Sequence, residues 1–238
     1  MNVSNIRSIL RKELRSFFNS PVAYIFIIAY LIILGWFFTS NLFLYNLATL
    51  RTVFEMTPFL LLFFAPAMTM RLISEEKKSG TLELLITKPI TESEIITGKF
   101  LAAWMLYFFT LLPTLCYYVT LAVLGDLDTG AVVGGYLGLL LVGAVFLAVS
   151  IFGSAVTENQ MVAFIVSLFI VFTLFMLDKV LFYLPTSVAS VLEYISIDYH
   201  FSNIARGVID SRDIIYYASA VGISLYFAKA VLEKRRWA

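Results

Sequence analysis

Long apolar segments recur along almost the whole chain and are separated by short polar stretches. Six of them are near or above the roughly 20 residues that an α-helix needs to cross the hydrocarbon core of a bilayer. They cover residues 22–44, 54–72, 97–124, 131–156, 161–182 and 213–232. The pattern predicts an all-α integral membrane protein with six transmembrane helices, in which residues 1–238 form a single membrane domain.

The second segment is the least regular of the six, because Pro58 and Pro66 interrupt it and Glu55 stands at its start. Proline is tolerated in membrane helices when neighbouring groups satisfy the freed carbonyls. We therefore expect a kinked helix here rather than a break, and a similar kink at Pro113 in the third segment.

Residues 4–19 alternate apolar and basic positions with a helical period. The apolar positions are Ile6, Ile9, Leu10, Leu14 and Phe17, and the arginines are Arg7, Arg11 and Arg15. This arrangement predicts a basic amphipathic helix that lies on a membrane surface. A signal peptide would also begin with basic residues, but here the charged region is long and no small-residue cleavage pattern follows it, which disfavours that alternative.

Composition supports a membrane protein. The chain is 61% hydrophobic and 14% charged, with a mean hydropathy of +0.90, whereas about a quarter of the residues in soluble domains are charged. The single cysteine, Cys116, excludes an internal disulfide.

The basic residues are distributed unevenly between the connections. Thirteen of the 17 Lys and Arg residues belong to the N-terminal helix, the segment 71–99 and the C-terminal tail. Since Lys and Arg favour cytoplasmic connections, we expect a multi-pass protein with both termini and this segment in the cytoplasm. The turn at 125–130 and the segment 183–212 would then face outward, and the turn at 157–160 inward.

The segment 71–97 combines several helix-ending and helix-starting signals. Four consecutive charges, from Glu75 and Glu76 to Lys77 and Lys78, are expected to require water. Gly80 permits a break in the helix, and Pro89 stops a following short helix because the residue before proline avoids helical geometry. Thr91 and Glu94 have the spacing of a capping box that starts the third span.

Between Gly80 and Pro89 the residues from Thr81 to Ile86 predict a short helix. Leu82, Leu85 and Ile86 share one face, while Glu83 can point the other way. A helix this short needs packing partners to be stable. The order of signals favours a docking element for another protein; the alternative is a structured loop that only seals the bundle.

The sequence lacks the residues that phosphate binding and a His-rich metal site require. The chain has no phosphate-binding loop of its own, since Gly98 and Lys99 are followed by Phe100 and no earlier glycine is in register. A single histidine, His200, cannot supply a His-rich metal site, so we expect it to pack at the membrane interface and we predict neither catalytic nor metal-binding residues.

Ionisable residues are almost absent from the middle of the spans. Asp178, Lys179, Lys99 and Lys229 fall near span ends, from which we expect them to reach the interface. An ion-coupled carrier usually holds such residues along its pathway. That class is therefore disfavoured, although sodium sites built from carbonyl and hydroxyl oxygens remain an alternative.

Two further patterns concern helix packing. Gly134 and Gly138 form a GxxxG motif, for which packing inside one subunit is favoured over a dimer contact. In the segment 183–212, apolar residues recur at helical spacing, which predicts short interfacial helices, with an ordinary loop as the alternative. These apolar residues are Val188, Val191, Leu192, Ile195, Tyr199, Phe201, Ile204 and Val208.

The charged segment also resembles a known family. The pattern E-E-K-x-x-G-T-L-E-L-L-x-x-x-P-x-x-x-x-E-x-x-x-G-K, from Glu75 to Lys99, is similar to the loop before the third span in ABC transporter permeases of the second exporter class. In that family the loop carries a coupling helix that sits in a cleft of the ATP-binding subunit. The resemblance assigns a coupling role to Glu75, Glu76, Gly80, Thr81, Leu82, Glu83, Leu84, Leu85, Ile86 and Pro89.

The resemblance extends over most of the chain. It implies a bacterial inner-membrane permease with short re-entrant helices between the fifth and sixth spans. The expected partners are two ATP-binding subunits, which carry the ATP and Mg, a second permease chain, identical or related, and membrane lipid; nucleic acid is not expected. The ending DYHFSNIARGVIDSRDIIYY is similar to the gliding-motility branch and, more loosely, to the nitrous-oxide-reductase maturation branch.

Together these features predict a permease subunit of an ATP-driven exporter that has no catalytic residues of its own. The alternative from another class is a non-transporting membrane scaffold whose ATPase drives a larger assembly such as gliding machinery. A membrane-embedded enzyme would need a catalytic cluster, and the sequence offers none.

Overall fold

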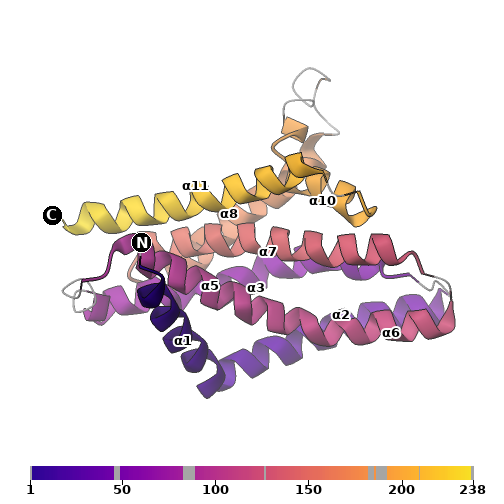
Figure 1. Ribbon diagram of the computed structural model, residues 1–238, viewed down its shortest axis with the longest axis horizontal. Helices are drawn as coiled ribbons and strands as arrows, with labels where there is room; N and C mark the ends of the chain where they lie inside the picture. Colours follow the sequence, from indigo (N-terminus) through magenta and orange to yellow (C-terminus); the bar gives the residue numbers. More distant parts are fainter. Residues whose placement is uncertain are drawn as a thin grey trace.

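The structure is a computed structural model that describes residues 2–45, 49–82, 89–125, 127–181, 185, 192–208 and 210–236. Within them the chain forms helices without a strand (Figure 1). The helices are α1 (Val3–Asn19), α2 (Pro21–Leu44), α3 (Arg51–Lys78), α5 (Glu92–Leu111), the 3-10 turn η1 (Leu112–Thr114), α6 (Leu115–Leu124), α7 (Thr129–Val156), α8 (Gln160–Leu181), α10 (Ile197–Ala205) and α11 (Ser211–Arg236).

Six helical segments are long and apolar enough to cross a membrane, which confirms the predicted number of spans. They correspond to α2, α3, the α5–α6 pair, α7, α8 and α11. Helix α3 runs without interruption through Pro58 and Pro66, whereas η1 at Pro113 separates α5 from α6. Helix α3 also continues to Lys78, well beyond the expected end at residue 72.

Helix α7 forms the centre of the bundle. Its most apolar window is 78% buried, compared with 17% for α8 and 11% for α11. Its glycines allow this close packing: a β-carbon added at Gly143 would lie 2.1 Å from the Tyr107 ring, and one added at Gly135 would lie 2.2 Å from the Phe54 ring. The core is therefore built around a helix with a small-residue surface, as is common where membrane helices approach closely.

The two ends of the bundle differ in what they carry. The N-terminus, the chain after α3 and the end of α11 lie at one end, which we call the charged end (Figure 1). The connections from α2 to α3 and from α6 to α7 lie at the opposite end, the far end. At the charged end, charged side chains of α1, α3 and α5 contact one another.

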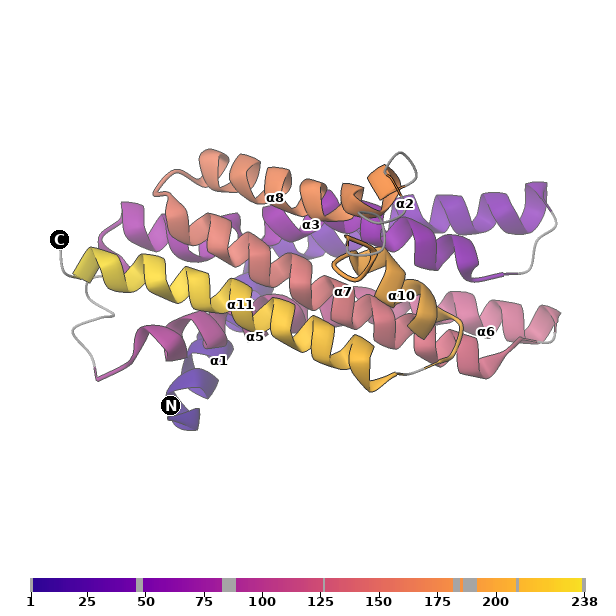
Figure 2. The ribbon, with the colours of Figure 1, turned by 90° about the horizontal axis from the view of Figure 1, so that it is seen from above.

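Helix α10 lies against α7, set back from the far end that α2 and α6 reach (Figure 2). The GxxxG motif makes this contact, since a β-carbon at Gly134 would lie 2.2 Å from the carbonyl oxygen of Ile204, and one at Gly138 would lie 2.9 Å from Phe201. The motif thus packs inside the subunit, as expected. Most of the first predicted helix of this segment, including Val188 and Val191, lies outside the described residues.

His200 is buried in α10 and packs against neighbouring side chains. Its Nδ1 lies 2.6 Å from Oδ1 of Asp213, and its Nε2 lies 3.1 Å from the carbonyl oxygen of Tyr194. The ring stacks on Tyr216 with centroids 4.0 Å apart. His200 therefore joins α10 to the first turn of α11.

Candidate functional site at the charged end

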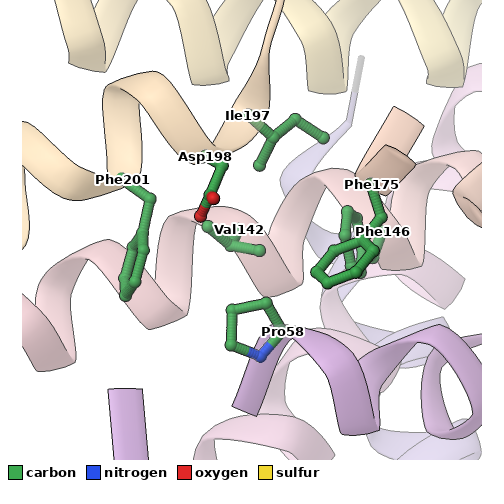
Figure 3. Close-up of a pocket in the computed structure, with 7 residues that line it drawn as sticks. All are labelled: Pro58, Val142, Phe146, Phe175, Ile197, Asp198 and Phe201. Atoms are coloured by element: carbon green, nitrogen blue, oxygen red, sulfur yellow. The ribbon is translucent and has the colours of Figure 1, made fainter. Parts of the chain in front are cut away.

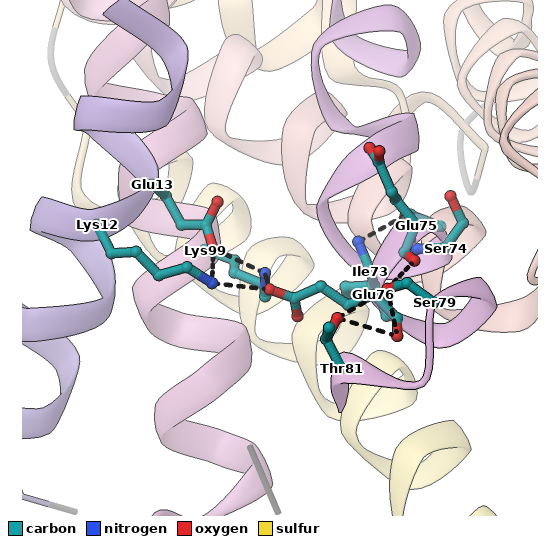
Figure 4. A network of polar contacts seen from close by, with 10 residues as sticks. Lys12, Glu13, Ile73, Ser74, Glu75, Glu76, Ser79, Thr81 and Lys99 are labelled. Atoms are coloured by element: carbon teal, nitrogen blue, oxygen red, sulfur yellow. Dashed lines mark hydrogen bonds and ion pairs between the residues drawn. The ribbon is translucent and has the colours of Figure 1, made fainter. Parts of the chain in front are cut away.

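Four charged side chains from three helices meet at the charged end (Figure 4). Nζ of Lys99 in α5 lies 2.9 Å from Oε1 of both Glu13 and Glu76, which belong to α1 and α3. Lys12 of α1 lies 3.0 Å from the same oxygen of Glu76 and 3.4 Å from Glu13. We call these four residues the charge cluster; its two cations and two carboxylates are balanced.

Burial differs sharply across the charge cluster. The side chain of Lys99 is 1% exposed, whereas that of Lys12 is 59% exposed. Burial alone would lower the pKa of the Lys12 ammonium, but its hydrogen bond to Glu76 and the nearby Glu13 carboxylate raise that pKa above its usual value. Through these ion pairs the cluster ties α1 to both α3 and α5.

A second polar contact joins α1 to the start of α5. Thr91 Oγ1 accepts a hydrogen bond from the Glu94 backbone N–H at 3.4 Å, and Glu94 Oε2 accepts one from the Thr91 N–H at 3.2 Å, so the capping box is present. The Glu94 carboxylate also accepts hydrogen bonds from the Asn2 N–H and from Asn5 Nδ2, at 2.5 and 2.9 Å. One carboxylate thus caps α5 and holds the N-terminus of α1.

Helix α1 crosses α5 where the sequence provides a glycine. A β-carbon added at Gly98 would lie 2.8 Å from Cβ of Ile9, so the two backbones are too close for any other residue. The buried face of α1 consists of Ile9 and Glu13, while Arg7, Arg11 and Arg15 are exposed as predicted. The apolar face of α1 therefore packs largely on protein.

The last turns of α3 are fixed to the end of α7. Oγ of Ser154 accepts hydrogen bonds from the backbone N–H groups of Ile73 and Ser74, both at 3.2 Å. Lys77 is buried and donates to the carbonyl oxygen of Ala155, in the last turn of α7. A cation at this position stabilises the negative end of the helix dipole.

Helix α3 ends just before Gly80, as predicted from the sequence. Ser79 is the C-cap, and Gly80 follows with a φ of +69°, a left-handed conformation that other residues adopt at a cost. Thr81 and the buried Leu82 are helical. Glu83, Leu84, Leu85 and Ile86 lie outside the described residues, so their helix remains a prediction.

The structure corrects two expectations about charge. Lys99 does not reach the interface but is buried between two carboxylates, and of the four charges from Glu75 to Lys78 only Glu75 and Lys78 are exposed. Glu75 points away from the charge cluster in Figure 4. The physical reason is helical geometry: α3 continues to Lys78, and with about 3.6 residues per turn Glu75 and Lys78 share the outer surface while Glu76 and Lys77 face neighbouring helices.

Sequence analysis missed Glu13, Lys12, Asn2 and Asn5 as parts of this site. The signal for Glu13 was available, because it is the one acidic residue on an otherwise apolar helix face. Its partner Lys99 is 86 residues away, and such a separation gives no periodic pattern.

The site offers firm connections rather than reactive groups. No cluster of three or more His, Cys, Asp or Glu residues that could hold a metal occurs among the described residues. The short stretch between Gly80 and Pro89 is held at both ends: α3 is fixed to α7 and the charge cluster, and α5 is fixed to α1. A push on this stretch would act on several helices at once.

Comparison with known proteins agrees with this geometry. The sequence model of one family, described as ABC-2 family transporter protein, matches residues 7–224. No curated protein matches the chain. The family match covers α1 from Arg7 onward, the charge cluster, and all six apolar spans except the end of α11. The chain therefore belongs to the ABC-2 family of transporter membrane proteins.

Proposed function

We propose that this chain is the permease subunit of an ATP-driven exporter and that residues 75–89 are its docking element for the ATP-binding subunit. ABC-2 permeases are non-catalytic membrane subunits that pair with ATP-binding subunits. ATP and Mg are held by that partner, in two copies, and two permease chains enclose the pathway. The charged end faces the cytoplasm of a bacterial inner membrane, and α10 is a re-entrant helix in the outer leaflet.

One observation carries the proposal: both ends of the stretch between Gly80 and Pro89 are anchored to several helices. A movement of the ATP-binding subunit can do work on the permease only if the contact is firmly connected to the membrane helices. Here the connection runs through buried ion pairs to α1 and α5 and through Ser154 and Lys77 to α7. A loop that only sealed the bundle would not need these anchors.

The docking element is tested with Leu85→Asp in a chain tagged at the C-terminus. We expect recovery of the ATP-binding subunit from solubilised membranes to fall at least tenfold, because a charge replaces the predicted apolar docking face. Val208→Asp is the matched control, since Val208 is an exposed apolar residue at the other side of the bundle, between α10 and α11. Undiminished recovery and undiminished ATPase stimulation with Leu85→Asp would refute the assignment.

The resemblance of the α10 region to the gliding-motility branch supports a second function, a scaffold that transmits ATP-driven movement without transporting a solute. Inside-out vesicles that contain the permease and its ATP-binding subunit distinguish the two functions. An exporter accumulates its substrate in an ATP-dependent way. A scaffold hydrolyses ATP while no candidate solute accumulates.

A further inference from the structure

A large pocket opens at the far end of the bundle and is not part of the coupling site. Its volume is about 1080 Å³, and it lies between the first turns of α3 and α7, the last turns of α8, and α10. Ligand pockets usually have volumes of about 300 to 1,000 Å³. The pocket is thus large enough for a molecule with a head group and a chain.

Along α3 and α8 the walls of the pocket change from charged to aromatic. In α3, Arg51 and Glu55 are followed by Phe59, roughly 12 Å further along the helix axis from Arg51. In α8, Lys179 is followed one turn deeper by Phe175. The pocket therefore has charged residues near the ends of α3 and α8 and phenylalanines further along these two helices.

A small cavity lies beside the pocket, and its lining is apolar apart from Asp198 (Figure 3). This cavity has a volume of only about 10 Å³ and shares Pro58, Phe175, Asp198 and Phe201 with the pocket. The remaining walls of that cavity include Val142, Phe146 and Ile197. A chain that enters from the rim would end against these residues.

Most charges on the rim are already paired. Arg51 Nε lies 2.7 Å from Glu55, and Lys179 Nζ lies 2.9 Å from Asp198. Asp128 accepts hydrogen bonds from the first N–H groups of α7, at 2.9 and 3.3 Å. Within the described part of the chain, Arg206 is the rim charge whose side chain has neither an ion pair nor a hydrogen bond. An unpaired guanidinium binds phosphate or carboxylate through two parallel hydrogen bonds.

We infer that this pocket binds an anionic amphiphile, with its phosphate or carboxylate head at Arg206 and its apolar chain among the phenylalanines below. The charged rim matches the head group of such a molecule, and the aromatic interior matches its apolar chain. If the amphiphile is the exported cargo, that assignment rests on the proposed function. Binding of the amphiphile to this chain does not depend on the proposed function.

Binding is measured with the purified permease, without an ATP-binding subunit, in nanodiscs of phosphatidylcholine. The probes are dodecyl phosphate, dodecanol and inorganic phosphate, and empty nanodiscs give the background. We expect saturable binding of dodecyl phosphate and at least tenfold weaker binding to Arg206→Gln, while dodecanol binds both proteins equally and inorganic phosphate binds neither at the same concentrations. Arg212→Gln is the matched control, because Arg212 is exposed nearby but does not line the pocket.

A second variant tests the apolar half of the site. Phe175→Ala should weaken the binding of dodecyl phosphate severalfold, because the chain loses an aromatic wall, and elution and thermal unfolding of each variant show whether it is folded. Equal binding of dodecyl phosphate to wild type and Arg206→Gln, or binding no greater than to empty nanodiscs, would overturn the inference. Binding of inorganic phosphate as tight as that of dodecyl phosphate would show an anion site only and would also overturn it.

Discussion

Lys99 shows how this protein keeps a cation inside a membrane bundle. An isolated buried charge costs several kcal/mol, and a single partner often fails to compensate for lost hydration. Here the ammonium group contacts two carboxylates, and Lys12 compensates the second negative charge from the exposed side. The cluster is therefore stable only as a set.

Lys99→Met should consequently destabilise the protein by about 3–5 kcal/mol, because Glu13 and Glu76 would lose their buried cation and be left beside each other with the exposed Lys12 as their one partner in the cluster. Thermal unfolding in detergent measures the effect. Lys12→Met is the matched control and should cost no more than about 1 kcal/mol, since the Lys12 side chain is largely exposed and Lys99 remains between the two carboxylates. Equal losses would contradict the view that Lys99 is the centre of the cluster. Adding Glu13→Gln and Glu76→Gln to Lys99→Met should restore part of the lost stability.

The buried pair of His200 and Asp213 makes a similar prediction. Oδ2 of Asp213 has no hydrogen-bond partner among the described residues, so its carboxylate depends on His200. His200→Phe keeps the stacking on Tyr216 but removes the hydrogen bond, and it should lower the free energy of unfolding by about 1–3 kcal/mol. The double variant His200→Phe/Asp213→Leu should be more stable than the single variant; a further loss would argue against the pairing.

At the scale of elements, hydropathy predicted the six spans because this signal is local, although α3 extends to Lys78, beyond its expected end at residue 72. The helix break at Gly80 and the capping box at Thr91 and Glu94 were predictable for the same reason. The docking of α1 on α5 and the position of α10 were not. They depend on a close approach at Gly98 and at Gly134, and a sequence shows a glycine without showing what lies against it.

The contact between α7 and α10 gives a test at this scale. Gly134→Ala places a β-carbon 2.2 Å from a backbone oxygen of α10, which cannot move aside alone, so α10 should be displaced. Limited trypsin digestion should then cleave after Arg206 several times faster than in wild type. Gly222→Ala is the control, since a β-carbon there meets no atom within 4 Å and the cleavage rate should not change. The same rate in both variants would mean that α10 tolerates the shift.

The whole molecule has a buried centre and apolar outer helices. Large apolar side chains of α2 and α8, such as Trp36 and Phe169, are more than two-thirds exposed, so lipid or a second permease chain must cover them in the membrane. The charges are separated along the long axis, with the charge cluster at one end and the paired rim charges at the other. This polarity is what makes the orientation testable.

Cysteine labelling of intact cells tests the orientation, with Cys116→Ser as the background. A membrane-impermeant maleimide should label Thr129→Cys at the far end and leave Ser79→Cys at the charged end unlabelled, although both positions are exposed. After permeabilisation both variants should react equally. Labelling of Ser79→Cys in intact cells would reverse the orientation and place the coupling site outside.

The hydrogen bonds from Asn2 and Asn5 to Glu94 have a consequence for biosynthesis. The ribosome makes α1 first, yet its partner Glu94 follows 92 residues after Asn2. At about 5–20 residues per second, the helix waits roughly 5–20 seconds before α5 exists to receive it. During that interval the membrane surface can cover its apolar face. The amphipathic pattern therefore allows α1 to lie on the membrane until it packs on α5.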